Sequence, residues 1–363
     1  MEQSGANAPY SVCIVNHEGA AVLPATLAAV CALAPPPAEV VLVDNASGDD
    51  GVALAVAMMP ALRVVRLSAN DGPGPARDAG YRAAWQDRIL FIDNDVRPDP
   101  GCGAALSRAL DVHPAAAFAM ARICHAHAPG TIQFDGAGAH ALGMMTLDHA
   151  ETPLASAAGG VREIGSLVTA CFMVDRQRWG QEPLCDPAFF IYFEDHELGL
   201  RSRLLGWRLL AVPAALALHG KGTPGMSLRA TGRFTQARIY YTIRNRWQVI
   251  LKFYQPRTLA ALAPALLLFE LFQLAGALRR GWLGQYWQAA VWIVANRRDL
   301  GERRRRIQGR RKLPDTAVLS GGPPPFAGPL LTGGIERAAA RLLARTVDVN
   351  WALASRLLGA AVR

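Results

Sequence analysis

Short apolar runs alternate with helix-like stretches along residues 10–110 of the chain. Each run is bounded by polar residues, which is typical of a buried strand. Repeated units of this kind predict an α/β fold with a mostly parallel sheet and helices on both faces. The predicted strands cover residues 11–15, 39–44, 62–67 and 89–93, and the predicted helices cover residues 20–33, 49–58 and 74–86.

The pattern is less regular over residues 111–165, where Gly, His and Ala are common and periodicity is poor. This composition predicts loops and irregular strands. Beyond it, the pattern predicts strands over 166–174 and 207–212, an aromatic-rich strand that leads from residue 189 to Glu194, a helix over 194–205, and a loop over 220–233.

From residue 234 onward the chain is predicted to be helical, and residues 258–278 are almost wholly apolar. A Pro/Gly-rich break over 321–333 precedes an arginine-studded amphipathic helix predicted over 335–362. We therefore expect an α/β domain over 1–233, a helical region with a basic segment over 234–320, and a linker with a C-terminal helix over 321–363.

Composition narrows the class of protein. A hydrophobic content of 51% with a mean hydropathy of +0.15 excludes a disordered chain and suggests contact with a membrane. The net charge of +9 implies an anionic partner. The six cysteines lack Cys-x-x-Cys spacing, which argues against a zinc site or a disulfide framework and fits a reducing cytoplasm. No basic region followed by an apolar stretch opens the sequence, so no secretory signal is expected.

Two carboxylates, Asp93 and Asp95, flank Asn94 where the strand over 89–93 ends. Open α/β sheets bind ligands at the carboxyl ends of their strands. Mg²⁺ and Mn²⁺ prefer oxygen ligands and usually take one or two carboxylates plus substrate phosphates. The pattern therefore predicts a nucleotide diphosphate held through a divalent metal. The competing interpretation is that these acids only form a turn or cap a helix.

Two further strand ends carry polar groups. Asp44 can accept a hydrogen bond from a nucleobase imide, or it can simply form an Asx turn. Asn70 and Gly72 open the helix that contains Arg77. Glycines there let the backbone approach a ligand, a helix N-terminus favours an anion, and Arg77 could reach a phosphate or the ribose. The alternative is a tight turn with a solvated arginine.

Acidic residues also follow the predicted aromatic strand. Glu194, Asp195 and Glu197 begin a helix, and a carboxylate there can act as the base that activates a sugar hydroxyl. Acids favoured by the helix dipole are the competing interpretation. His219 could bind a metal if other ligands lie nearby, although a single histidine is more often structural.

In order and spacing these segments resemble the family 2 glycosyltransferases with the GT-A fold, in particular their rhamnosyltransferase-like bacterial branch. The resemblance covers roughly residues 10–220. It rests on residues 11–16, Val-Asp-Asn-Ala-Ser at 43–47, the Gly-rich loop from Asn70 to Gly80, residues 93–95, and most specifically Phe189–Asp195 with Leu198, Arg201, Arg203, Gly206-Trp207-Arg208 and His219.

The resemblance implies an inverting transfer of a sugar, hexosyl or rhamnosyl, from a dTDP- or UDP-sugar to a hydroxyl of a lipid-linked or polysaccharide acceptor. It implies Asp195 as the general base, supported by Glu194. It also implies a Mg²⁺ or Mn²⁺ ion on Asp95, Asp93 and His219. The nucleotide contacts that it implies are Asn16, Asp44, Asn70, Gly72, Arg77, Asp93 and Asn94.

Two points stay open. A non-catalytic GT-A module that binds nucleotide or glycan is the alternative function, although both acidic motifs are intact. The sequence departs from the family pattern at positions that border donor and acceptor, so neither the sugar nor the acceptor is assigned. These positions are His17, Glu18, Asp78, Thr169, Ala170, Cys171 and Asp175.

The apolar segment 258–278 is long enough to cross a hydrocarbon core of ~30 Å, but it contains Glu270 and Gln273. A charged residue at mid-membrane costs about 2.5 kcal/mol or more. Both flanks are basic, so we favour a helix that lies in the interface or is re-entrant over a true span, on the cytoplasmic face of the bacterial inner membrane. Arginines over 297–312 would attract anionic lipid, whereas no fold signature of a nucleic-acid-binding protein accompanies them.

Overall fold

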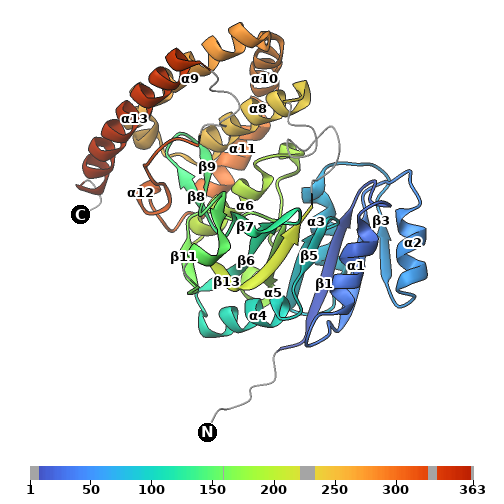
Figure 1. The fold of residues 1–363 in the computed structure, drawn as a ribbon. Helices are drawn as coiled ribbons and strands as arrows, with labels where there is room; N and C mark the ends of the chain where they lie inside the picture. The colour runs from blue at the N-terminus through green and yellow to red at the C-terminus, as the bar shows by residue number, and fades with distance from the viewer. Residues whose placement is uncertain (1–7, 158, 221–233, 326–332, 361–363) are drawn as a thin grey trace. The chain divides into compact units, whose positions relative to one another are not determined.

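The computed structural model describes residues 8–157, 159–220, 234–325 and 333–360. These residues fall into two compact units (Figure 1). Unit 1 comprises the residues up to Ala137, Leu147–Ser202 and the stretch that begins at Trp207. Unit 2 comprises Gly138–Thr146, Arg203–Gly206 and the residues from Phe234 onward. The functional boundaries expected at residues 233 and 320 stay a prediction.

Unit 1 is built on a sheet whose first half is parallel. Strands β1 (Tyr10–Asn16), β2 (Glu39–Asp44), β3 (Arg63–Arg66) and β4 (Arg88–Asp93) pair in the order β3–β2–β1–β4. Every residue of β1 is buried, as expected for a parallel strand that is covered on both faces. The four predicted strands are thus confirmed, and so are the helices between them, α1 (Leu23–Cys31), α2 (Gly51–Met58) and α3 (Pro73–Ala83).

The second half of the sheet is mixed. Strand β12 (Cys171–Asp175) runs antiparallel to β4 and to β6 (Ala116–His125), and β13 (Arg208–His219) runs parallel to β6. The strands that complete it are β5 (Val96–Pro98), β7 (Ala128–Phe134), β10 (Thr152–Pro153) and β11 (Arg162–Ile164). The helical elements of this half are α4 (Cys102–Val112), η1 (Leu154–Ser156), α5 (Arg176–Trp179), η2 (Pro187–Phe189) and α6 (Glu194–Leu204).

Three sequence-based expectations are wrong here. Residues 111–165 are not mainly irregular, because they contain the ten-residue strand β6. This strand is buried on both faces and rich in alanine, so it lacks the alternation that identifies a half-exposed strand. The strand expected over 166–174 begins only at Cys171, and the one expected over 207–212 continues to His219 after a register shift between Val212 and Leu216.

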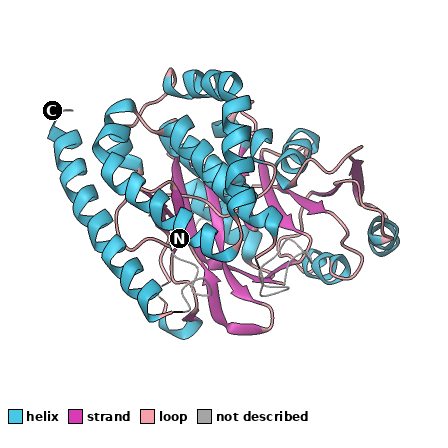
Figure 2. Ribbon diagram, turned by 90° about the horizontal axis from the view of Figure 1, so that it is seen from above, coloured by secondary structure: helices cyan, strands magenta, loops and turns pink. Residues whose placement is uncertain are grey.

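Unit 2 is mainly helical, as predicted. The hairpin of β8 (Ala137–His140) and β9 (Met144–Leu147) lies largely in this unit, and Tyr254 donates to the His140 carbonyl from the helical part. The described helices of this unit are α8 (Gln236–Phe253), α9 (Pro256–Arg280), α10 (Leu283–Ala295), α11 (Arg297–Gln308), the short α12 (Asp315–Val318) and α13 (Gly334–Ala360). Figure 2 draws all helices in cyan.

Among the described residues, α9 is the one helix long and apolar enough to cross a membrane by length and composition. The loop predicted over 220–233 lies outside the described residues except for Gly220, and the centre of the break predicted over 321–333 lies outside them as well.

Candidate functional site

The carboxyl edge of the parallel strands brings several predicted residues together. Asn16 at the end of β1 pairs in register with Asp44 at the end of β2, and Val15 pairs with Asp93 of β4. The Asn16 amide donates to Asp44 Oδ1 at 3.3 Å and accepts a hydrogen bond from Asn94 at 2.9 Å. Because Asn16 is fully buried, its contacts orient Asp44 and Asn94.

A second amide links the two loops beside Asp44. Asn45 donates to Asn70 Oδ1 at 2.8 Å and to the Gly72 carbonyl at 3.0 Å, and Asn70 Oδ1 also accepts from the Gly72 amide. Asn45 was not among the predicted site residues. Its place in the Val-Asp-Asn-Ala-Ser motif was the available signal.

Gly72 and Gly74, at the start of α3, lie against the chain segment that precedes α6. Gly72 has a φ of +96°, and a Cβ there would lie 2.0 Å from the carbonyl oxygen of Phe190. A Cβ on Gly74 would lie 1.9 Å from the Cys185 sulfur. Both glycines therefore admit this segment, and their approach to a ligand stays a prediction.

Gly72→Ala should therefore destabilise the protein by about 1–3 kcal/mol, because the side chain meets backbone and the φ is unfavourable. The measurement is the free energy of unfolding in urea. Gly101→Ala is the matched control, since nothing lies within 4 Å of its Cβ position. Equal stability of the two variants would contradict the packing described for Gly72.

The Arg77 side chain is buried within the candidate site and does not extend from α3 into solvent. Its guanidinium is 5% exposed, and Nη2 lies 2.7 Å from Asp93 Oδ1 while Nη1 lies 3.7 Å from Glu194 Oε1. This burial excludes the solvated arginine, while contact of Arg77 with a phosphate or the ribose stays a prediction. Nε and Nη1 have no hydrogen-bond partner among the described residues, so the guanidinium keeps donor capacity.

The aromatic segment before Glu194 is a strained turn and not the predicted strand. Residues 187–189 form η2, and Phe190, Tyr192 and Phe193 then have φ values of 59°, 62° and 68°. Bulky residues rarely adopt this left-handed conformation, and strain of this type concentrates at functional sites. The turn places Glu194 and Asp195 at the first positions of α6.

Glu194 and Asp195 form a coupled acidic pair. Burial, reinforced by the charge of Asp195, raises the pKa of Glu194 to about 8, and the positive charge of Arg77 opposes this shift. Burial also raises the pKa of Asp195 to about 6, while a hydrogen bond from the His196 amide and the charge of Arg77 act in the opposite direction. The two groups titrate as a coupled pair, because ionisation of one carboxyl disfavours ionisation of the other. Such a pair can accept a proton near neutral pH, and the family resemblance names Asp195 as the base.

The residues predicted to bind a metal do not all converge. His219 Nε2 lies 3.3 Å from Asp95 Oδ1, and both residues are buried. Gln133 Oε1 lies 3.0 Å from Nδ1 of His219, which fits a tautomer in which Nδ1 donates to Gln133. Asp93 instead bonds Arg77, and within the described ranges no cluster of three or more His, Cys, Asp or Glu residues could hold a metal. A carboxylate with an imidazole fits an ion whose remaining ligands are phosphates.

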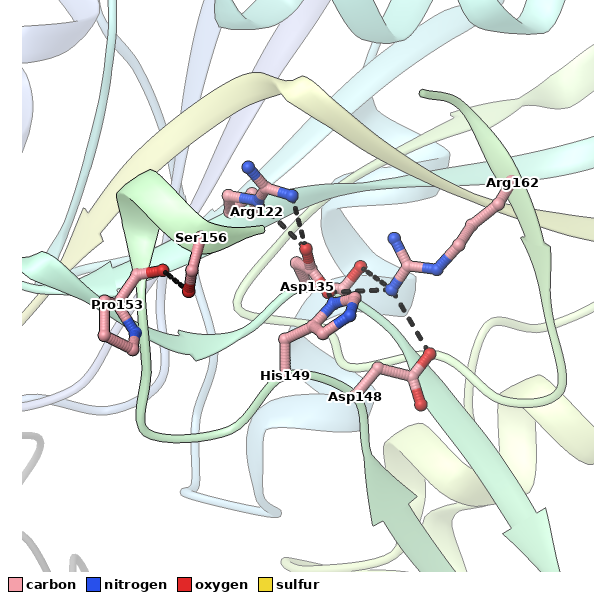
Figure 3. A network of polar contacts seen from close by, with 7 residues as sticks. All are labelled: Arg122, Asp135, Asp148, His149, Pro153, Ser156 and Arg162. Atoms are coloured by element: carbon pink, nitrogen blue, oxygen red, sulfur yellow. Dashed lines mark hydrogen bonds and ion pairs between the residues drawn. The ribbon is translucent and has the colours of Figure 1, made fainter. Parts of the chain in front are cut away.

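A buried charge network lies in the stretch that the sequence pattern left unassigned (Figure 3). Both Asp135 oxygens are used: Oδ2 accepts from Arg122 at 2.7 Å, and Oδ1 accepts from Arg162 and His149. Although burial alone would raise it, these hydrogen bonds lower the pKa of the Asp135 carboxyl. Asp135 directly follows β7, Arg122 belongs to β6 and Arg162 belongs to β11. The network therefore links these strands, and the turn at Asp148, in the half of the sheet that is remote from β1.

Solved structures share this fold. The crystal structure of GalNAc-T7 with UDP, GalNAc and Mn²⁺ is 17% identical over 72% of this chain and 51% of that chain, with a TM-score of 0.55. S. aureus TarS is 15% identical over 94% of this chain and 55% of that chain, with a TM-score of 0.52. The chain thus spans about half the length of each. The α/β fold with its mostly parallel central sheet is that of the GT-A glycosyltransferases.

Sequence comparison gives the family. The model of glycosyl transferase family 2 matches residues 11–151. An N-acetylglucosaminyl-diphospho-decaprenol L-rhamnosyltransferase of Mycobacterium tuberculosis is 30% identical over 211 residues, which cover 51% of this chain and 67% of the relative. The succinoglycan biosynthesis protein ExoO of Rhizobium meliloti is 47% identical over 64 residues, 17% of this chain and 18% of ExoO. The chain therefore belongs to glycosyltransferase family 2.

Proposed function

We propose that this protein transfers a hexosyl or rhamnosyl group, with inversion, from a nucleotide-diphosphate sugar to a hydroxyl of a lipid-linked or polysaccharide acceptor. One observation carries the proposal: Arg77 connects Asp93, on the donor side, with Glu194, next to the candidate base Asp195. A charge that joins both sides of a reaction centre fits a group transfer better than simple binding. The relative whose name specifies a decaprenol-linked substrate supports a lipid-linked acceptor.

In this proposal the nucleotide lies at the carboxyl edge of β1, β2 and β4. Asp44 accepts a hydrogen bond from the imide of uracil or thymine, so the donor is a UDP- or dTDP-sugar. Asn16 is fully buried, so its role in this proposal is to orient Asp44 by a hydrogen bond. Asn70, Gly72 and Asn94 shape the surrounding loops, and the free donors of Arg77 face the diphosphate.

A Mg²⁺ or Mn²⁺ ion would be held by Asp95 and His219, with Asp93 nearby, and would neutralise the leaving diphosphate. The chain's own residues perform the rest of the reaction. Asp195 accepts the proton of the acceptor hydroxyl as the oxygen attacks the sugar carbon. Glu194 keeps its proton, and Arg77 stabilises the negative charge of Asp195 and Asp93.

We further propose that residues 1–233 hold the catalytic machinery and that residues 234–363 bring the enzyme to the cytoplasmic face of the bacterial inner membrane. Peripheral or monotopic association would place the active site near a lipid-linked acceptor. The exposed apolar helix α9 supports this placement, because only 17% of its most apolar window is buried.

Thermal shift with UDP-, dTDP- and GDP-sugars, with and without Mn²⁺ or Mg²⁺, tests the proposal. A ligand at a hundred times its Kd stabilises the folded protein by about 2.7 kcal/mol. We expect a metal-dependent rise in Tm with one pyrimidine nucleotide class, and its loss in Asp95→Asn. Asp49→Asn is a control carboxylate that lies on the same edge and accepts from the Ala20 amide. A rise in Tm that does not depend on metal and persists in Asp95→Asn would contradict the assignment of Asp95 as a metal ligand.

A further inference from the structure

Two helices of unit 2 expose apolar stripes at helical spacing. On α9 the stripe is formed by Leu267, Leu271, Leu274 and Leu278, which are 63%, 55%, 40% and 66% exposed. On α13 it is formed by Leu342, Val349, Leu353 and Leu357, which are 68%, 61%, 55% and 70% exposed. These spacings place each set on one face of its helix. Residues of this kind gathered on a surface mark an interaction site.

These stripes are separate from the faces by which the two helices pack. Ala265 and Phe269 of α9 form a buried cluster with Leu343 and Val347 of α13. Each helix therefore has one apolar side in the core of the unit and a second apolar side in solvent. The neighbouring helix α10 continues this pattern, with Trp287 72% exposed. An ordinary soluble helix would carry polar residues on its second side.

The polar residue within α9 is fixed by its neighbours. Glu270, midway along α9, accepts hydrogen bonds from Arg246 and Trp247 of α8 and from Tyr286 of α10. A membrane-spanning α9 would have to break these contacts or take α8, with its buried arginine, into the hydrocarbon. Either outcome is costly, because buried ions must stay paired in a medium of low dielectric constant.

Helix α13 adds the same constraint. It runs antiparallel to α9, since Glu336 near its start pairs with Arg280 at the end of α9, while Asn350 donates to the Ala261 carbonyl. Along its length α13 exposes Arg341 and Arg345, close in sequence to its apolar stripe. A spanning α9 would draw these cations into the bilayer. A helix pair that lies in the plane of the interface leaves them at headgroup depth.

We propose that α9, α10 and α13 form a monotopic docking surface that lies in the headgroup region of an anionic phospholipid bilayer. The leucine stripes and Trp287 enter the acyl boundary, as amphipathic helices do at membranes. The exposed Arg341 and Arg345 of α13 contact lipid phosphates. This docking mode rests on the proposed transfer to a lipid-linked acceptor, because it explains how the enzyme meets that substrate when α9 lies in the plane of the membrane.

Flotation of the full-length protein with phosphatidylcholine vesicles, with and without phosphatidylglycerol, tests the surface. We expect binding to the anionic vesicles that weakens with salt. Leu353→Ser with Leu357→Ser should reduce the partition coefficient by about tenfold or more, because two exposed apolar side chains are lost. Val112→Ser is the matched control, since Val112 is 73% exposed but lies on α4 of unit 1. Binding unchanged by the leucine pair would overturn the proposal.

Two further measurements separate the alternatives. In inverted inner-membrane vesicles, a C-terminal epitope should be digested by added protease; protection would mean that α9 spans and would overturn the in-plane arrangement. Sedimentation should give the same mass for wild type and the Leu353/Leu357 variant; a dimer lost in the variant while vesicle binding persists would assign the stripes to a second copy instead.

The thermal-shift assay keeps this inference distinct from the proposed function. If vesicle binding fails while metal-dependent donor binding persists, the docking surface is wrong and the enzyme assignment stands. If the protein binds anionic vesicles but no nucleotide sugar, the enzyme assignment fails and the docking surface stands.

Discussion

Asp195→Asn is expected to lower kcat for sugar transfer by about 10²–10⁴-fold, because the variant cannot accept the proton of the acceptor hydroxyl. Donor binding should change little, since the substitution removes no residue of the nucleotide edge. Glu194→Gln is the matched control. Because Glu194 keeps its proton in the proposed mechanism, the amide of the Gln variant is close in shape and charge to the wild-type side chain. Single-turnover kinetics on both variants checks the assignment.

A large loss in Glu194→Gln with a small loss in Asp195→Asn would reverse the two roles. The pH dependence offers an independent check. With the pKa of Asp195 at about 6, kcat/KM should be low under acidic conditions and rise with pH through about 6, because the base must be ionised. A profile that is flat between pH 5 and pH 7 would exclude this carboxyl as the base.

Arg77→Met is expected to affect both activity and stability. It leaves the Asp93 carboxylate without its buried cation and removes the guanidinium beside Glu194, and breaking a buried pair costs about 3 kcal/mol or more. Because Arg77 lowers the pKa of Asp195, its loss should also shift the rise of kcat/KM to higher pH. Arg77→Lys should restore stability in part, since an ammonium cannot reach both carboxylates with a planar fork.

Arg82→Met on the same helix is the control, since Arg82 is exposed and should be nearly neutral. The shift of the pH profile distinguishes a positioning role from a purely structural one, which would lower Tm without moving the apparent pKa. If Arg77→Met melts at the wild-type temperature with an unchanged profile, the bridge between the two acidic motifs has no role in the reaction.

The sequence alone determined the parts of the fold that depend on neighbouring residues. Apolar runs with polar boundaries identified β1, β2, β3 and β4, and the acids at their ends place the predicted site at the carboxyl edge of these strands. The start of α6 at Glu194 and the long helix α9 were also evident, because helix starts and apolar length are local properties.

The tertiary structure decided what depends on contacts between distant segments. Strand β6 could not be recognised because it lies between β12 and β13 inside the sheet and nearly all of its residues are buried, so its sequence lacks the alternation of a half-exposed strand. The turn before Glu194 was taken for a strand because its left-handed conformation is maintained by packing, with Gly72 against Phe190. Arg77 is buried because Asp93 and Glu194, from two other elements, compensate its charge. Local patterns report periodicity, whereas burial, strain and charge pairing are set by chain segments that meet only in the folded protein.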